Sequence, residues 1–259
     1  MLLVVCSFTV CLAQQRFKIT GELGGTIGGD LVLVSAGPEG AVKLDEALMV
    51  NGSFEFSGQV DSMILAYIMT AEQQPIATLM LENLEYTIVE GGREGENGIE
   101  VQGGGESQKI LNLYNAINQD ITREKMRMEQ EVRAAYAEQN QMKLQALQQQ
   151  FEKTMAEVGK KQEELFKTYK DSPVTAFMIA SVMLQMDYSP LKALHEMLGE
   201  PAKTCFYGQL IAIQLAALKQ VEPGFVAPVF NGATLNGDTL SLHGIKARVK
   251  LLDFWASWC

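Results

Sequence analysis

The chain has 259 residues, which is enough for two domains of ordinary size, each with its own core. Its hydrophobic content of 47% and charged content of 20% are typical of globular proteins and exclude a disordered chain. Acidic residues (31) outnumber basic ones (21), and the net charge of −10 argues against nucleic-acid binding, which needs clustered lysine and arginine for phosphate contacts. No apolar run of about 18 residues or more occurs, so we predict no transmembrane segment in the mature chain.

The first residues, "MLLVVCSFTVCLAQQ", predict a secretory signal peptide over residues 1–13. The segment is uncharged and apolar up to Ala13 and then turns polar, as expected of an apolar region followed by a small-residue cleavage site. A buried first strand is the alternative, and because a basic start is missing, the true N-terminus could lie upstream of Met1. Neither Cys6 nor Cys11 follows the pattern of a lipid-anchored protein. Export would place the protein in the periplasm or cell envelope, where thiol chemistry needs its own reductant.

Residues 14–104 predict a β-rich N-terminal domain. Short runs with β-branched and aromatic residues, such as "RFKITGEL", "DLVLVSA" and "SFEFSGQV", are separated by Gly, Asn, Asp or Pro. Asn51-Gly52 between two such runs predicts a tight hairpin, since both central residues of a type I′ turn need a positive φ. Phe54 and Phe56 alternate with polar residues, which indicates one buried and one solvated face. We expect a small antiparallel sandwich or barrel, whose glycine-rich stretches are turns and a linker because none has phosphate-loop spacing.

Residues 105–220 predict a helical region. From Ser107, a plausible N-cap, to about Lys170 there is no proline, and apolar residues recur three or four positions apart. One unbroken helix of that length would reach about 95 Å, so we expect a break near residues 139–141 or at Gly159 and hence a helical hairpin. Its apolar stripe is either an intrachain core or the interface of a homodimer. Three shorter helices follow over residues 172–186, 189–198 and 201–220, each with proline near its start.

Two cysteines remain after removal of the signal peptide, Cys205 and Cys259, and these are too few and too distant for a disulfide scaffold. Cys205 lies in an apolar helical stretch and is expected to be a small core residue. His195 has no second ligand at metal-binding spacing and is expected to be an ordinary surface residue. We therefore predict no metal site and no cofactor.

Cys259 differs from Cys205 in its surroundings. The preceding "VKLLDFWA" is a nearly continuous apolar run, which is typical of a central strand covered on both faces. A cysteine just past such a strand, at the start of a helix, has its thiolate stabilised by backbone N–H groups and the helix dipole. Because the thiolate is the attacking species in disulfide exchange, Cys259 is the candidate nucleophile.

The last 39 residues, "VEPGFVAPVFNGATLNGDTLSLHGIKARVKLLDFWASWC", resemble the opening of the thioredoxin-like domain of TlpA-type thiol-disulfide oxidoreductases of bacterial envelopes. The matching pieces are Gly224, "APVF", the "NGDTLSL" hairpin and "LLDFWASWC". The preceding β-rich and helical regions resemble an N-terminal extension of uncharacterised function found on such proteins. The residue patterns above predict a β sandwich or barrel-like domain and a helical middle region, and the resemblance adds, over residues 221–259, the incomplete start of a thioredoxin-like α/β domain. Together they predict an α+β fold.

The resemblance also implies a role for four residues. Cys259 would be the nucleophilic thiol, and Asp253 the buried proton acceptor for the second cysteine of the family's Cys-x-x-Cys motif. Trp255 and Trp258 would form the apolar surround that meets the substrate. A backbone-capping role for Asp253 and plain core packing for the tryptophans are the alternatives. The implied partners are protein thiols and disulfides and an envelope reductant.

Two family features are missing from the sequence, the second motif cysteine and the later cis-proline loop. We therefore expect this chain to be a fragment that forms a mixed disulfide without turning over, and residues 221–259 to be poorly ordered.

Two other functions remain as alternatives. A non-enzymatic binding or dimerisation module would use the β-rich and helical regions that make up most of the chain. A peroxiredoxin-type peroxidase shares the "APxF" opening, but its reactive cysteine follows a turn with Pro and Thr, whereas Cys259 follows "WASW".

Overall fold

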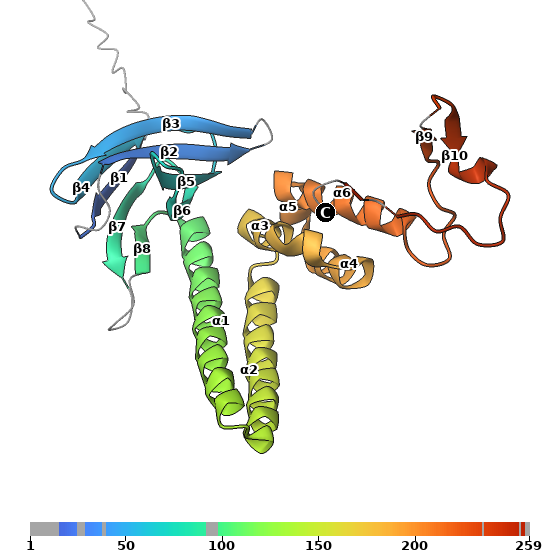
Figure 1. The fold of residues 1–259 in the computed structure, drawn as a ribbon. Coiled ribbons are helices and arrows are strands. Elements are labelled where there is room, and N and C mark those ends of the chain that lie inside the picture. The colour runs from blue at the N-terminus through green and yellow to red at the C-terminus, as the bar shows by residue number, and fades with distance from the viewer. Residues whose placement is uncertain are drawn as a thin grey trace, which may run out of the picture.

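The computed structural model of the chain describes residues 16–24, 29–37, 40–91, 98–234, 236–253 and 255–256. Of these residues 47% are helical and 29% lie in strands, with the sheets first and the helices after them, which confirms the α+β class. Figure 1 shows a β sandwich, a long helical hairpin, a cluster of shorter helices and a C-terminal segment with a small ribbon. The predicted signal peptide, residues 1–13, lies outside the described residues.

Two four-stranded sheets form the sandwich. The first, here called the β1 sheet, has the order β4-β1-β7-β8, and the second, the β2 sheet, has the order β3-β2-β5-β6. The bounds of these strands are β1 Phe17–Glu22, β2 Gly29–Gly37, β3 Gly40–Met49, β4 Ser53–Gly58, β5 Ile64–Thr70, β6 Pro75–Leu81, β7 Glu85–Gly91 and β8 Gly98–Gly103.

Strand pairing is antiparallel as predicted, except that β1 and β7 pair in parallel. The prediction of a purely antiparallel sandwich was therefore wrong for this pair. A parallel pair needs a long connection between its strands, and here the connection is strand β4 together with the entire β2 sheet.

The sandwich core follows from alternation along the strands. In β1 and β4 alternate side chains are buried, and Phe54 and Phe56 both point inward as predicted. Gly21 lies opposite Phe54, and a Cβ at this glycine would overlap the phenylalanine ring. The close approach of the ring to the neighbouring strand therefore depends on glycine. The buried core residues of the sandwich include Phe17, Ile19, Leu31, Leu33, Phe54, Phe56, Ile68, Leu79, Leu81, Tyr86 and Ile88.

The Asn51-Gly52 turn joins β3 to β4 and carries the chain from the β2 sheet to the β1 sheet. Asn51 has φ 53° and Gly52 has φ 82°, so both central residues occupy the left-handed region that a type I′ turn requires. The predicted tight turn is confirmed, but the two strands that it joins do not form a paired hairpin, because a single bridge between Val50 and Ser53 links them before they enter different sheets.

Six α-helices follow within the described residues: α1 Glu106–Ala137, α2 Gln141–Thr168, α3 Pro173–Val182, α4 Tyr188–Met197, α5 Glu200–Thr204 and α6 Phe206–Gln220. The predicted break of the long helix is confirmed at residues 138–140, where Gln139 adopts φ 51°. Two details of the predicted helices were wrong. The N-cap of α1 is Gly105 rather than Ser107, and the third short helix is divided in two at Cys205. Among the described helices, none combines the length and the apolarity that crossing a bilayer needs.

The outer face of the β2 sheet carries a second core, which it shares with the helices. Leu65 of β5 and Met80 of β6 are paired neighbours and pack with helical residues such as Leu111, Phe166 and Met178. Strand β5 is thus apolar on both faces, because one face covers the sandwich core and the other faces the helices. The predicted domain limits at residues 104/105 and 220/221 stay a prediction.

The C-terminal segment contains the ribbon β9 Asn231–Ala233 and β10 Thr239–Ser241 and the 3-10 turn η2 Leu242–Gly244. Its two strands pair antiparallel across a turn in which Gly237 has φ 85°. A hairpin is therefore present, but its first strand precedes the predicted stretch "NGDTLSL", which supplies only the turn and the second strand. Residues 245–253 follow without a strand.

Candidate functional site

The sequence-predicted redox residues fall in the C-terminal segment, and the structure describes two of the four. Cys259 and Trp258 lie outside the described residues. Asp253 is exposed, and Trp255 is 76% exposed. The expected burial of Asp253 is absent, because no strand within the described residues pairs with residues 249–253. The roles assigned to the four residues stay a prediction.

The segment upstream of Asp253 is organised by a few local hydrogen bonds. The Leu242 N–H donates to the Phe230 carbonyl at 2.9 Å, and the His243 Nε2 donates to the Ala227 carbonyl at 3.0 Å. Apolar side chains of the same segment stay in solvent, among them Val226, Val229, Val249 and Leu251. Such an exposed apolar series marks a surface that normally packs against something else.

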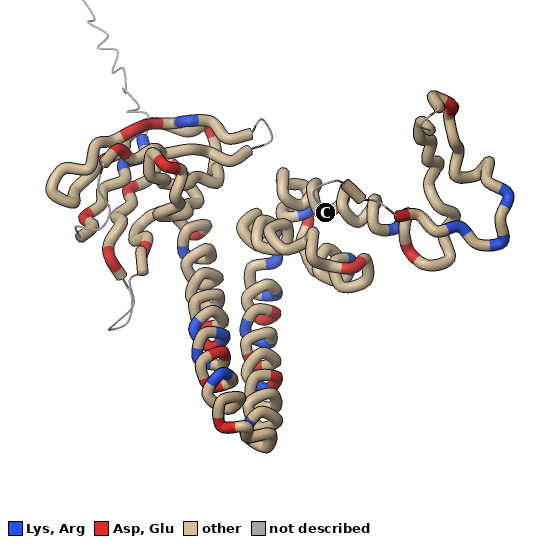
Figure 2. Tube along the Cα trace, in the orientation of Figure 1, with Lys and Arg blue, Asp and Glu red and all other residues tan. Residues whose placement is uncertain are grey.

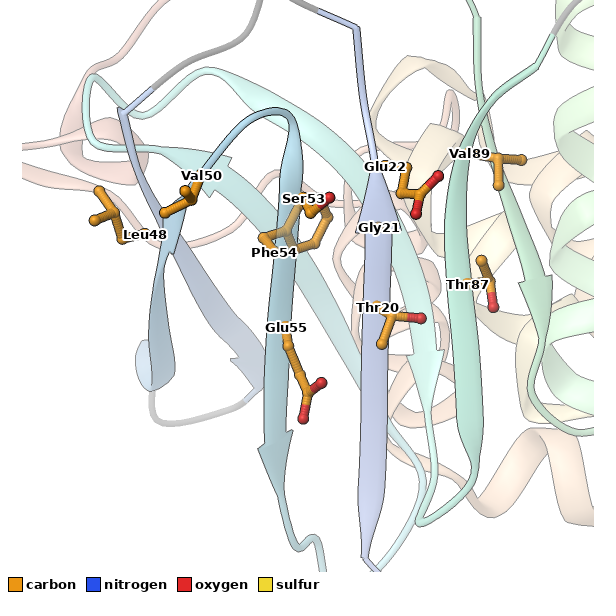
Figure 3. Close-up of a pocket in the computed structure, with 10 residues that line it drawn as sticks. All are labelled: Thr20, Gly21, Glu22, Leu48, Val50, Ser53, Phe54, Glu55, Thr87 and Val89. Atoms are coloured by element: carbon orange, nitrogen blue, oxygen red, sulfur yellow. The ribbon is translucent and has the colours of Figure 1, made fainter.

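An open groove lies on the outer face of the β1 sheet. Figure 3 shows it crossing three neighbouring strands, β4, β1 and β7, with Leu48 and Val50 at one end. Its volume is about 540 Å³. It is lined by Thr20, Gly21, Glu22, Leu48, Val50, Ser53, Phe54, Glu55, Thr87 and Val89.

Strand register explains how distant residues meet in the groove. Thr20 lies opposite Glu55 on one side and Thr87 on the other, and Glu22 lies between Ser53 and Val89. These positions alternate with the buried core residues, so their side chains all point to the outer face. The groove therefore presents two rows of mostly polar side chains.

The charge of this face is acidic. Glu22 and Glu55 line the groove, and Glu85 and Glu100 are exposed on the neighbouring positions of β7 and β8. Lys18 is on the same face, and its Nζ lies 3.1 Å from a carboxylate oxygen of Glu55. A ligand with positive charge is thus favoured over one with negative charge.

Both the end and the edge of the groove offer further contacts. Leu48 and Val50 are 63% and 56% exposed, which gives the groove an apolar end. Along the edge of β4, the Ser57 N–H donates to Oδ2 of Asp45 at 3.1 Å, and Ser53 pairs with Val50. Because alternate residues of an antiparallel strand direct their backbone groups to the same side, the N–H and C=O of Glu55 also face this edge. Asp45 and Val50 already occupy this edge on both sides of Glu55.

The groove carries no reactive constellation. No histidine or cysteine lines it, and across the described parts of the chain no group of three or more His, Cys, Asp or Glu could hold a metal ion.

Sequence reasoning missed the groove residues. Each is an ordinary outward position of an alternating strand, and the alternation does identify them as solvent-facing. It does not reveal that β1 and β7 are neighbours, because they are far apart along the chain.

No curated protein matches this chain. The family match found for this chain covers N-terminal residues and does not include residues 221–259. The resemblance of the C-terminal segment to thioredoxin-like domains therefore stays a prediction. Residues 17–110, which span the eight strands of the sandwich and the beginning of α1, match the family described as "Domain of unknown function (DUF4369)".

Proposed function

We propose that the protein is an exported thiol-disulfide oxidoreductase that acts on protein disulfides in the cell envelope, with Cys259 as the attacking thiol. The observation that carries the proposal is the run "LLDFWASWC", a cysteine placed directly after an apolar segment. The β9–β10 hairpin upstream of this run supports the proposal, since the TlpA-type resemblance places a hairpin there.

The chemistry needs two thiols. The Cys259 thiolate attacks one sulfur of a substrate disulfide, the new S–S bond forms, and the other substrate sulfur leaves as a thiolate that takes up a proton. A second thiol then attacks the Cys259 sulfur and releases the reduced substrate, which leaves a disulfide on the protein. An envelope dithiol reductant restores both thiols. Asp253 would accept the proton of the second thiol, and Trp255 and Trp258 would shield the reacting sulfurs from water.

The coding sequence beyond codon 259 gives a first test. A cysteine codon at the third position after Cys259 is the expected result. A stop codon or a different residue there contradicts the oxidoreductase proposal. Rapid consumption of peroxide by the complete gene product, lost on Cys259→Ser, would instead favour the peroxidase.

We propose as a second candidate that the sandwich is a binding module for an extended, positively charged segment of a partner protein. The groove on the β1 sheet is the observation that favours it, because acidic side chains and an apolar end meet there. The two candidates are compatible, since a bound protein segment could be presented to a redox domain.

A short labelled peptide that alternates lysine and leucine tests the binding module. Its Kd for the full chain should rise about three- to tenfold in the double variant Glu22→Gln, Glu55→Gln, since each exposed charge pair contributes roughly 0.2–1 kcal/mol. Glu157→Gln on the exposed face of α2 is the matched control and should leave the Kd unchanged. Equal effects of the control and the double variant would exclude the groove as the binding site.

A further inference from the structure

The α1–α2 hairpin has an apolar groove in its far half, where only these two helices pack against each other. Figure 1 shows the hairpin extending away from the sandwich and from the shorter helices. Met128 and Leu147 are buried there, whereas Val132, Leu144 and Phe151 are only partly covered. Two helices bury just the facing sides of their apolar stripes, so the remaining apolar surface is left open.

This surface forms a groove of about 380 Å³. Met128, Val132 and Tyr136 of α1 line one wall. Leu144 and Phe151 of α2 line the other. Tyr136 is 66% exposed, a high value for an aromatic residue beside an apolar groove. The groove has the size and the chemistry to take helix side chains from outside.

The charge of the hairpin points to the occupant. Residues 106–168 contain ten Asp and Glu and ten Lys and Arg, so this segment is neutral while the whole chain carries −10. Figure 2 shows the two signs interleaved along both helices. Many are paired within the hairpin, such as Arg127 with Glu124 and Glu131, and Lys143 with Glu138. The excess negative charge lies entirely in the rest of the chain, where two copies would repel each other.

The rim of the groove is also neutral. Gln141, Gln145 and Gln148 line it on the α2 side, and each can both donate and accept a hydrogen bond. A second identical rim can pair with such residues without a charge mismatch.

We infer that the groove binds the same groove of a second copy of this chain, so that two hairpins form an antiparallel four-helix bundle about a two-fold axis. Such an interface uses the same patch on both subunits and requires self-complementary charge, which the neutral hairpin provides. Helix α2 is about 42 Å long, which leaves enough length for extended packing of one hairpin along the other. This inference does not depend on either proposed function.

Sedimentation of the full chain in dithiothreitol tests the interface, since the reductant excludes a disulfide-linked dimer. The expected result is a dimer whose dissociation constant rises at least about tenfold in Tyr136→Glu and in Val132→Glu. Tyr136 is mostly solvent-exposed, so its substitution leaves the hairpin folded, which an unchanged helical circular dichroism spectrum verifies. Val42→Glu, at an exposed valine of β3, is the matched control and should leave the dimer intact.

Two results would overturn the inference. One is a monomer at every concentration up to about 100 μM. The other is a dimer that neither hairpin variant weakens, which would place the interface elsewhere.

Discussion

The backbone N–H and C=O of Met80 form hydrogen bonds with two side chains rather than with a neighbouring strand. Met80 is fully buried on β6, an edge strand of the β2 sheet. Its N–H donates to Oε1 of Gln108 at 2.9 Å, and its carbonyl accepts from the Tyr86 hydroxyl at 2.9 Å. Gln108 Nε2 donates to Asn112, whose Nδ2 donates to the Val101 carbonyl of β8. Helix α1 therefore joins the edges of both sheets through a buried polar network.

Gln108→Leu should lower the free energy of unfolding by about 1–3 kcal/mol, because the buried Met80 N–H loses its acceptor. The measurement is urea denaturation of the variant beside the parent chain. Gln149→Leu, at an exposed position of α2, is the matched control and should change stability by less than about 0.5 kcal/mol. Equal midpoints for the Gln108 variant and the parent would contradict the role of the network.

Tyr86, whose hydroxyl bonds to Met80, makes the stability of the protein depend on pH. Burial raises the pKa of Tyr86 to about 12 from an ordinary value of 10.0. The folded state therefore favours the neutral phenol, so its contribution to stability is complete below pH 10 and is lost as the pH rises towards 12. Tyr86→Phe should flatten the fall in stability over this range, measured by denaturation at closely spaced pH values. An unchanged slope would show that other groups cause the fall.

The elements differ in how far the sequence predicts them. Alternation along β1 and β4 and the Asn51-Gly52 pair predict strands and a tight turn correctly, because these signals are local. The hairpin of α1 and α2 also follows from its apolar stripe and its length. The break at Cys205 was missed, although Gly208 is a sequence signal for it, because a Cβ at this position would lie 2.2 Å from the Ala202 carbonyl oxygen of α5.

The loop between α1 and α2 carries an element-level prediction. Gln139 is held at φ 51°, in the left-handed region that costs a non-glycine residue about 1 kcal/mol. Gln139→Gly should therefore raise the thermal midpoint, whereas Gln139→Val should lower it, because a β-branched residue tolerates this conformation least. Calorimetry of the two variants and the parent chain measures these midpoints. A midpoint below that of the parent for the glycine variant would contradict the idea that Gln139 is strained.

The whole molecule could be predicted only in outline. The order of strands, helices and C-terminal segment follows from the sequence, but the parallel β1–β7 pair and the core shared by the β2 sheet and the helices do not. Both depend on contacts between residues far apart along the chain. For the same reason the groove residues of β1, β4 and β7 were not found, whereas Cys259 was singled out because its signal is a contiguous run.

Reduction of insulin disulfides by dithiothreitol, with the product of the complete gene as catalyst, tests the central claim most directly. Thiol-disulfide exchange at Cys259 predicts a rate well above that of dithiothreitol alone, which returns to that background in Cys259→Ser and is retained in Cys205→Ser. A rate that stays at background with the parent protein, or that survives Cys259→Ser, would contradict the assignment of an oxidoreductase built on Cys259.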